Sequence, residues 1–402
     1  MSLAPVIQKQ LFRDAPFAWV MRNKAVVSSR YRRDDIAFFD RRMENYLCLL
    51  VQLDLSLDDG LQRIPLDDWG SVFVHTWLAL EQSDDAALLR LPTLFTTPTH
   101  WEECIAALSY HSPDALNWAL PLLGKHEAGL ADSCFHASLA ALGNQRMCIN
   151  REALEHALRS DNVRTLATAL ALVGDTRMNM NANMDNWCRH SDVSVRFHAI
   201  RTAVLSGETA RCRELGEYIV EDNPLFVEAL LLLMPLYSAD EASRVVHEIN
   251  QSTLSPRIKL WTMAISGLVK HIPDIIAWSQ VPEYCRLAGE AFACITGVDI
   301  EEDDLSPLLE DSDLPVAKST DSWYRDYEAD LPVPGVDELR VWWAEHQHYF
   351  TAERYLMGLE FRSSTFDTVL NNGNQLQRRI AAVARALNDK TQVVFNVKQR
   401  AC

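Results

Sequence analysis

The sequence predicts an all-α protein built mainly from stacked helix pairs. Glycine (14 of 402 residues) and proline (16) are scarce, and this composition favours helices over a turn-rich β fold. Apolar residues recur with helical periodicity along most of the chain. The middle of the chain also repeats with a period of about 30 residues, which is typical of helical solenoids.

The internal repeat is marked by five helix starts, each followed by an apolar run. Successive starts are 29, 31, 30 and 33 residues apart, and they lie at Asp132, Asp161, Asp192, Asp222 and Ser255. Because Asp and Ser accept hydrogen bonds from the free N–H groups of a first helical turn, we expect these residues to be N-caps. Glycines end four of the runs, which predicts C-terminal caps at Gly143, Gly174, Gly207 and Gly267.

The third repeat shows how the helices should pack. Val195, Ala199 and Ala203 share one helical face, so we expect Val195 to face the core between helices. Further apolar stripes at 154–158, 212–220 and 245–249 predict a second helix in each unit. Such a helix pair cannot bury its apolar face alone, and stacking the pairs would make one continuous core.

Both ends of the chain are predicted to be helical without the repeat. At the N-terminal end, an amphipathic helix is expected over 36–55, preceded by a basic patch of Arg22, Lys24, Arg30, Arg32 and Arg33. At the C-terminal end, helices are expected over 336–349 and 364–388, and the one candidate strand is 392–397. We therefore predict an N-terminal helical region at 1–98, repeats at 99–298, an acidic linker at 299–334 and a C-terminal helical module at 335–402.

The acidic linker carries much of the charge of the protein. The net charge is −17, and residues 299–330 hold 12 acidic residues against Lys318 and Arg325. Several prolines and weak periodicity predict a flexible loop there, which Trp323 and Tyr324 would anchor if it packs. An acidic chain is repelled by phosphate backbones and anionic lipids, so we expect neither nucleic-acid nor membrane binding.

The cysteines and the apolar runs indicate a cytoplasmic protein. Nine cysteines, an odd number without any CxxC pair, favour buried thiols in a reducing compartment. The N-terminal residues lack the basic and apolar segments of a secretory signal. The longest apolar run, 225–237, contains Glu228 and is too short to span a bilayer, so it predicts a buried helix.

Two resemblances extend this interpretation. Asp192-x-x-Val195-Arg196 resembles the HEAT-repeat signature at the start of a second helix, and Asp161-x-Val163-Arg164 is a shortened version. This resemblance implies a HEAT-like solenoid, and it implies that polar residues of the second helices line a groove. On that basis His136, His198, Arg201 and Lys259 are candidate partner-binding residues.

The second resemblance covers nearly the whole chain. It rests on segments in a fixed order: Phe17-Ala-Trp-Val-Met-Arg22, Gly289-Glu-Ala-Phe292, Ile295-Thr-Gly-Val-Asp299, Asp330-Leu-Pro332, Trp342-Trp343, Arg354-Tyr-Leu-x-Gly358 and Gln377-Arg-Arg379. Together they resemble the uncharacterised HEAT-repeat proteins encoded in bacterial type VI secretion loci. This resemblance implies a contractile-secretion context and no particular reaction.

No catalytic constellation is apparent in the sequence. His346-Gln-His348 is a poor metal pair because side chains two positions apart on a helix diverge. The adjacent carboxylates Glu102-Glu103 and Asp84-Asp85 diverge in the same way and suit helix first turns instead. No glycine-rich phosphate loop is present. We therefore predict a non-enzymatic protein without cofactor or metal, for which a small-molecule ligand is not expected.

The expected partner is a protein, namely a type VI effector or spike component. The chain would act as an immunity protein or an effector adaptor, since a stiff solenoid offers a large surface at little ordering cost. Trp342 and Trp343 either form an exposed binding hot spot or anchor the C-terminal module. Two alternatives stay open: a HEAT-like enzyme of the DNA glycosylase or lyase type, and a constitutive structural accessory of the secretion machine.

Overall fold

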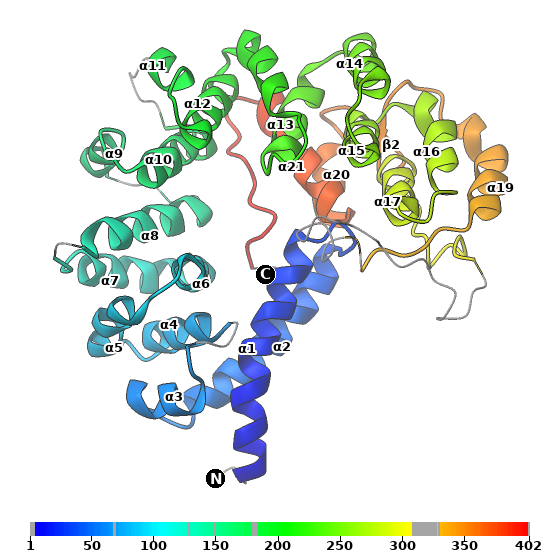
Figure 1. Cartoon of the computed structure of the whole chain (residues 1–402). Coiled ribbons are helices and arrows are strands. Elements are labelled where there is room, and N and C mark those ends of the chain that lie inside the picture. The colour runs from blue at the N-terminus through cyan, green and yellow to red at the C-terminus, as the bar shows by residue number, and fades with distance from the viewer. Residues whose placement is uncertain are drawn as a thin grey trace. The chain divides into compact units, whose positions relative to one another are not determined.

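The computed structural model describes residues 5–66, 70–127, 129–147, 150–178, 184–307, 328 and 330–400. These residues are mostly helical and contain one two-stranded sheet, which confirms the predicted all-α class (Figure 1). They belong to two compact units. The first comprises Met1–Ala25, Asp34–Ser206 and Lys398–Cys402, and the second comprises Val26–Arg33 and Gly207–Val397.

The first unit begins with two long helices and continues with shorter ones. Its helices are α1 (Pro5–Val27), α2 (Arg33–Val51), α3 (Leu57–Arg63), α4 (Ser71–Glu81), α5 (Asp85–Arg90), η1 (Leu91–Leu94), α6 (Pro98–Tyr110), α7 (Pro113–Leu123), α8 (Ala131–Asn144), α9 (Arg151–Ala157), α10 (Val163–Thr176), α11 (Asp185–Cys188) and α12 (Val193–Ser206).

Alternate helices of the first unit pack in chain order. Helix α4 contacts α6, α6 contacts α8, α8 contacts α10, and α10 contacts α12, whereas α7, α9 and α11 each pack beside the helix that follows them (Figure 1). Val195 and Ala199 of α12 are fully buried, as the sequence periodicity predicts. A second core fills the N-terminal end, where Trp19 stacks on Phe73 at 3.6 Å between ring centroids.

The predicted helices of the repeat are present, but their predicted caps are only partly correct. Asp192 accepts hydrogen bonds from the N–H groups of Ser194 (2.9 Å) and Val195 (3.0 Å), as predicted. The N-caps of α8, α10 and the later helix at 226 are instead Leu130, Asn162 and Leu225. Ser255 is an N-cap whose side chain makes no capping hydrogen bond.

Gly143 and Gly174 lie inside helices and not at helix ends, so their prediction as C-caps is wrong. A Cβ atom on Gly143 would lie 3.0 Å from Cδ1 of Leu172, and one on Gly174 would lie 2.7 Å from Oγ1 of Thr202. The two glycines therefore serve the close approach of α8 to α10 and of α10 to α12. Gly207 and Gly267, by contrast, do follow helix ends in the left-handed conformation.

This difference predicts unequal effects of two matched substitutions. Gly174→Ala should destabilise the first unit by about 1–3 kcal/mol, because its neighbours include the Cα atom of Thr202 at 3.2 Å and the backbone cannot yield easily. Gly143→Ala meets only the flexible end of Leu172, so the helix propensity of alanine, about 1 kcal/mol better than glycine, should offset most of the cost. Urea denaturation of both variants measures the difference, and equal losses would contradict this account of the packing.

The second unit combines helices with one hairpin. Its elements are η2 (Thr209–Tyr218), α13 (Phe226–Leu233), η3 (Met234–Leu236), α14 (Ala239–Gln251), α15 (Pro256–Ser266), η4 (Val269–His271), α16 (Ile272–Trp278), α17 (Cys285–Thr296), α19 (Val336–His346), η6 (Gln347–Tyr349), β1 (Tyr355–Leu356), β2 (Leu359–Glu360), α20 (Phe366–Asn372) and α21 (Gln375–Asn388).

Three sequence predictions for this unit need correction. The stripe at 212–220 forms the 3₁₀ helix η2. The helix expected over 364–388 is broken into α20 and α21, because the side chain of Asn374 caps a new helix by accepting a hydrogen bond from the N–H of Gln377 (3.0 Å). The segment 392–397 is not a strand, and the two strands lie at 355–360 instead. The apolar run at 225–237 does form the buried helix α13, as predicted.

The hairpin β1–β2 fixes the C-terminal ends of α15 and α17. Its turn residues Met357 and Gly358 both have positive φ, as a tight two-residue turn requires. The N–H of Tyr355 donates to the carbonyl of Gly267 (2.8 Å), and the N–H of Met357 donates to that of Cys294 (2.9 Å). Backbone groups of the hairpin thereby satisfy carbonyls that a helix end leaves without partners.

Arg354 extends this arrangement through its side chain. Its guanidinium donates to the carbonyls of Ser266 (2.7 Å), Tyr237 (2.7 Å) and Met234 (3.1 Å), and it lies over the ring of Phe361. The planar guanidinium of arginine carries enough N–H donors to reach three acceptors at once, and an ammonium group does not reproduce this geometry.

Arg354→Lys should therefore destabilise the second unit by about 2 kcal/mol, since buried carbonyls would lose their donors. Chemical denaturation followed by circular dichroism measures this loss. Arg362→Lys is the matched control, because Arg362 is exposed and makes one ion pair, with Glu360 (3.0 Å). A loss as small as that of the control would show that the three hydrogen bonds contribute little.

The ends of the predicted acidic linker are packed. Leu305 and Leu331 are buried, and the N–H of Gly335 donates to the carbonyl of Leu305 (2.7 Å). Residues 308–327 and 329, with Trp323 and Tyr324, lie outside the described residues. The predicted flexibility of that stretch therefore stays a prediction.

Candidate functional site

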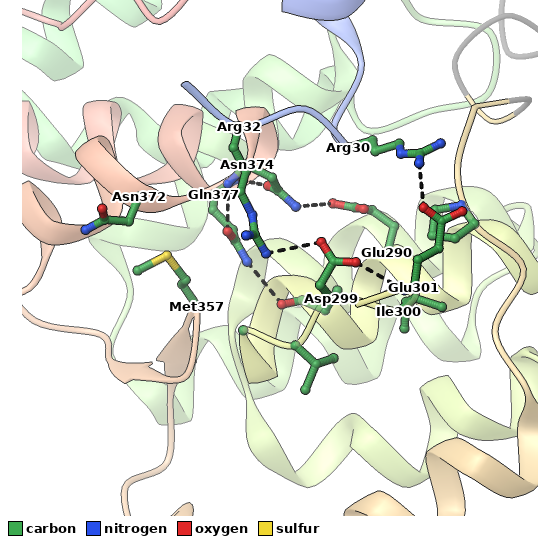
Figure 2. Close-up of a pocket in the computed structure, with 14 residues that line it drawn as sticks. Arg30, Arg32, Glu290, Asp299, Ile300, Glu301, Met357, Asn372, Asn374 and Gln377 are labelled. Carbon is green, nitrogen blue, oxygen red and sulfur yellow. Dashed lines mark hydrogen bonds and ion pairs between the residues drawn. The ribbon is translucent and has the colours of Figure 1, made fainter. Parts of the chain in front are cut away.

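A polar pocket in the second unit is the best candidate site. Its cavity measures about 330 Å³ and lies between α17, the 297–301 turn and α21 (Figure 2). The lining residues differ in kind from the apolar core, since most of them are charged or carry amides. They are Arg30, Arg32, Glu290, Ala293, Gly297, Val298, Asp299, Ile300, Glu301, Pro332, Met357, Asn372, Asn374 and Gln377.

Glu290 is the buried acid of this pocket. It lies in the middle of α17, a helix with almost no exposed residues, and only 6% of Glu290 is exposed. Its carboxyl accepts a hydrogen bond from the side-chain amide of Asn374 (3.0 Å). Burial, assisted by the negative charge of Asp299, raises the pKa of Glu290 to about 8, although the Asn374 hydrogen bond acts in the opposite direction. The carboxyl is therefore mostly protonated at neutral pH.

Asn374 and Gln377 are held in place by a capping box at the start of α21. The N–H of Asn374 donates to Oε1 of Gln377 (2.9 Å), while the Gln377 amide donates to the carbonyl of Ala293 in α17 (3.0 Å). The N–H of Gln375 also donates to the carbonyl of Tyr31 (2.9 Å). These bonds position the amides of α21 against α17 and against the 26–33 segment.

Ion pairs surround the pocket opening. Arg32 pairs with Asp299 (3.1 Å) and Glu302 (3.4 Å), and Arg30 pairs with Glu301 (2.5 Å). Asp299 also accepts hydrogen bonds from the N–H groups of Glu301 and Glu302 (both 3.1 Å), so its carboxylate is firmly placed. Two arginines therefore face three carboxylates at the opening, so both arginines are fully paired.

The predicted N-terminal basic patch does not exist as a free positive surface. Arg30 and Arg32 are neutralised by acidic residues of the 299–302 turn. In the first unit, Arg22 is buried, and it donates to Asp40 (2.8 Å) and to the carbonyl of Lys398 (2.9 Å). Sequence alone could not show this, because the acidic partners of Arg30 and Arg32 follow about 270 residues later.

The pocket brings together segments that the sequence analysis quoted only as a resemblance. Five of the quoted segments in the second unit contribute a lining residue, and these residues are Glu290, Asp299, Pro332, Met357 and Gln377. Trp342 and Trp343 are not among the lining residues. The individual residues were missed as site residues because they lie up to 87 positions apart and share no known chemical motif. The order of the segments in the chain indicated the family resemblance, but it did not indicate that the segments form a pocket.

Three of the predicted binding residues lie in the first unit, and two of them, His136 and Arg201, contact a neighbouring helix. Nε2 of His136 on α8 is 3.1 Å from the hydroxyl of Thr168 on α10, and burial lowers the pKa of His136 to about 4. Arg201 on α12 is paired with Asp175 of α10, which also binds Arg146 at 3.0 Å. His198 is half-buried on α12. Arg201 therefore has an intramolecular role, and binding by these residues stays a prediction.

The other three predicted residues lie in the second unit. The ammonium of Lys259 donates to the carbonyl of Ser252 (3.0 Å). Trp342 is half-buried, stacks on His346 at 4.3 Å between ring centroids and meets Phe292 of α17 edge to face. Trp343 packs against Phe350. These contacts favour the anchoring role for Trp342, because its ring joins α19 to α17.

The structure describes seven of the cysteines and the two pairs of adjacent carboxylates. Six cysteines are buried free thiols, namely Cys104, Cys134, Cys188, Cys212, Cys285 and Cys294, whereas Cys48 is exposed. Burial raises the pKa of Cys104 to about 12, so this thiol is unreactive. Asp85 lies in the first turn of α5 as predicted, and Asp84 is its N-cap. The same prediction is wrong for Glu102 and Glu103, which lie beyond the first turn of α6; Glu103 instead accepts hydrogen bonds from the N–H groups of Gly70 (3.0 Å) and Phe73 (3.3 Å) at the start of α4.

The comparisons with known proteins add no assignment. No family model, curated protein or solved structure matches this chain. Within the described ranges, no three His, Cys, Asp or Glu residues are grouped as metal ligands, and no helix has the length and apolarity needed to cross a membrane. The pocket around Glu290 is thus characterised by its own geometry alone.

Proposed function

We propose that this chain is a non-enzymatic protein-binding scaffold of a bacterial type VI secretion system, acting as an immunity protein or an effector adaptor. The observation that supports it best is the chain-order packing of α4, α6, α8, α10 and α12. Helices packed in this order hold their outer residues in fixed positions before a partner arrives. Binding then costs little conformational entropy, which favours protein recognition over a wide surface.

The N-terminal edge of α10 and α12 is the part of this surface that we assign to the partner. Val163 and Val193 are the first residues of these two adjacent helices, and they are 41% and 48% exposed. Arg164 and Ser194 beside them are exposed as well. Neighbouring apolar side chains rimmed by polar ones are typical of protein contacts. The row formed by His136 and Arg201 is less suitable, because those side chains already bind neighbouring helices.

The enzymatic alternative has weaker support. A DNA glycosylase of HEAT-like architecture would need a basic groove and an aromatic pocket beside its carboxylate. The described lining of the Glu290 pocket includes no aromatic side chain, and both of its arginines are paired with carboxylates. If the chain is a constitutive structural accessory of the secretion machine, only the identity of its partner differs. Identifying the partner therefore distinguishes this alternative from the proposal.

The test is co-purification with the products of neighbouring genes. The tagged chain should retain one effector or spike component in a stable complex through size-exclusion chromatography. Val163→Glu with Val193→Glu should abolish this complex while leaving the circular dichroism spectrum unchanged. Val341→Glu on α19 is the matched control, because Val341 is also an exposed valine and lies in the other unit. Release of a base from alkylated DNA by the purified chain would overturn the proposal.

A further inference from the structure

Glu290 differs from the other buried acidic residues of the described chain. Asp40 and Glu328 are also buried, but each has an arginine as counterion: Arg22 at 2.8 Å and Arg257 at 2.8 Å. The one side-chain partner of Glu290 in the described residues is the neutral amide of Asn374. A buried carboxyl without a cation is unfavourable in its ionised form. Among the described residues of the second unit, Glu290 is therefore a buried acid without a cation beside it.

The cavity beside Glu290 has room for that counterion. A volume of about 330 Å³ exceeds what a single guanidinium or ammonium group needs. The two arginines of the pocket are not available to Glu290, because Arg32 is bound to Asp299 and Glu302 and Arg30 is bound to Glu301. Among the described residues that line the pocket there is no further cation, so the cation would have to come from outside these residues.

The other hydrogen-bonding groups of the pocket also suit a ligand that donates hydrogen bonds. The Asn372 amide nitrogen donates to the carbonyl of Thr368 (3.0 Å). The two amides of the capping box are already paired with backbone groups or with Glu290. Acceptor atoms of Glu290 and Asn372, together with the carboxylates of Asp299 and Glu301, are thus the groups that a ligand would meet. A planar guanidinium or an ammonium offers several N–H donors to such acceptors.

From these observations we propose that the Glu290 pocket binds one guanidinium or ammonium group, with the ionised Glu290 carboxylate as its counterion. The group belongs either to a free small molecule or to an arginine or lysine side chain of a protein partner. No sequence motif predicted a ligand of this kind. The proposal does not depend on the proposed function, because it concerns the chain alone.

The first experiment titrates the purified chain with methylguanidinium in an isothermal calorimeter. Binding should release about one proton at pH 7, which is visible as a difference in heat between phosphate and Tris buffers. Because burial raises the pKa of Glu290 to about 8, the affinity should rise about tenfold between pH 6 and pH 7 and level off above pH 8. The other ionisable groups at the pocket are Asp299, Glu301, Arg30 and Arg32, and none of these types normally titrates in this range.

One control ligand and two variants make the titration specific. Tetramethylammonium carries the same charge without N–H donors and should not bind. Glu290→Gln keeps the shape of the side chain and its acceptor for Asn374, and it should weaken methylguanidinium at least tenfold and remove the pH dependence. Glu345→Gln, at an exposed position of α19, should bind as the wild type does. Equal affinity of Glu290→Gln and wild type, or an affinity independent of pH, would overturn the proposal.

A second experiment identifies the source of the cation. Methylguanidinium is added to the complex of the chain with its co-purified protein partner. Dissociation of the complex would mean that a basic side chain of the partner occupies the pocket, whereas an intact complex that still binds methylguanidinium would mean that the cation is a free small molecule. If no partner is found, the first experiment still decides whether the pocket binds a cation.

Discussion

Val195→Asp should unfold the first unit or leave it barely stable. Val195 is fully buried in α12, which packs closely on α10. An aspartate there would place a carboxylate in this buried position, and burying an unpaired carboxylate costs at least about 3 kcal/mol. Because small domains are stable by only about 5–15 kcal/mol, this loss is a large fraction of the total. Thermal unfolding followed by circular dichroism measures it.

Val193→Asp is the matched control for this prediction. Val193 begins the same helix two residues earlier and is 48% exposed. An acidic residue in the first turn of a helix interacts favourably with the helix dipole, so the control should change stability by less than about 1 kcal/mol. Equal melting temperatures for the two variants would mean that α12 is rotated relative to the register given by the repeat.

The repeat period predicted the helices of both units well, because it reflects burial. The stripe of Val195 and Ala199 is buried as expected, since a residue that recurs every 3.6 positions must face one side of its helix. Helix ends were less predictable. The start of α10 shifted by one residue to Asn162, whose side chain caps the helix, whereas α8 begins after Leu130, which makes no side-chain capping hydrogen bond.

The glycines show a different limit of sequence reasoning. Gly143 and Gly174 look like helix stops in a linear sequence, whereas in the structure they permit neighbouring helices to approach each other. Which role a glycine has depends on the residue that it faces across the helix pair, such as Thr202. That residue is about 30 positions away and cannot be identified from local composition.

The candidate pocket was beyond sequence reasoning for a related physical reason. Arg32 meets Asp299 across 267 positions, and Asn374 meets Glu290 across 84. Each of these residues is unremarkable in its local context, since charged and amide side chains are usually exposed. Only the buried position of Glu290, without a counterion, makes the group unusual.

The pH dependence of the stability of the protein should reveal the buried carboxyl of Glu290. The pKa of Glu290 is raised from 4.5 to about 8 in the folded chain, chiefly by burial. Below pH 4.5 both the folded and the unfolded chain hold the proton, so Glu290 has no effect on stability there. Between pH 4.5 and 8 only the folded chain retains it, and the free energy of unfolding therefore falls as pH rises, by about 1.4 kcal/mol per unit.

Glu290→Gln should remove this fall in stability. The amide stays neutral at every pH and still accepts a hydrogen bond from Asn374, so the variant should match the wild type near pH 5 and exceed it by about 4 kcal/mol at pH 8. The difference between the two proteins is the quantity to measure, by urea denaturation at each pH. Other groups also titrate: His136, whose pKa is lowered to about 4, makes both proteins less stable as pH falls below about 6.5. That contribution cancels in the difference in stability between Glu290→Gln and the wild type. If this difference stays constant from pH 5 to pH 8, Glu290 is ionised in the folded chain. Its cation is then already supplied by the protein.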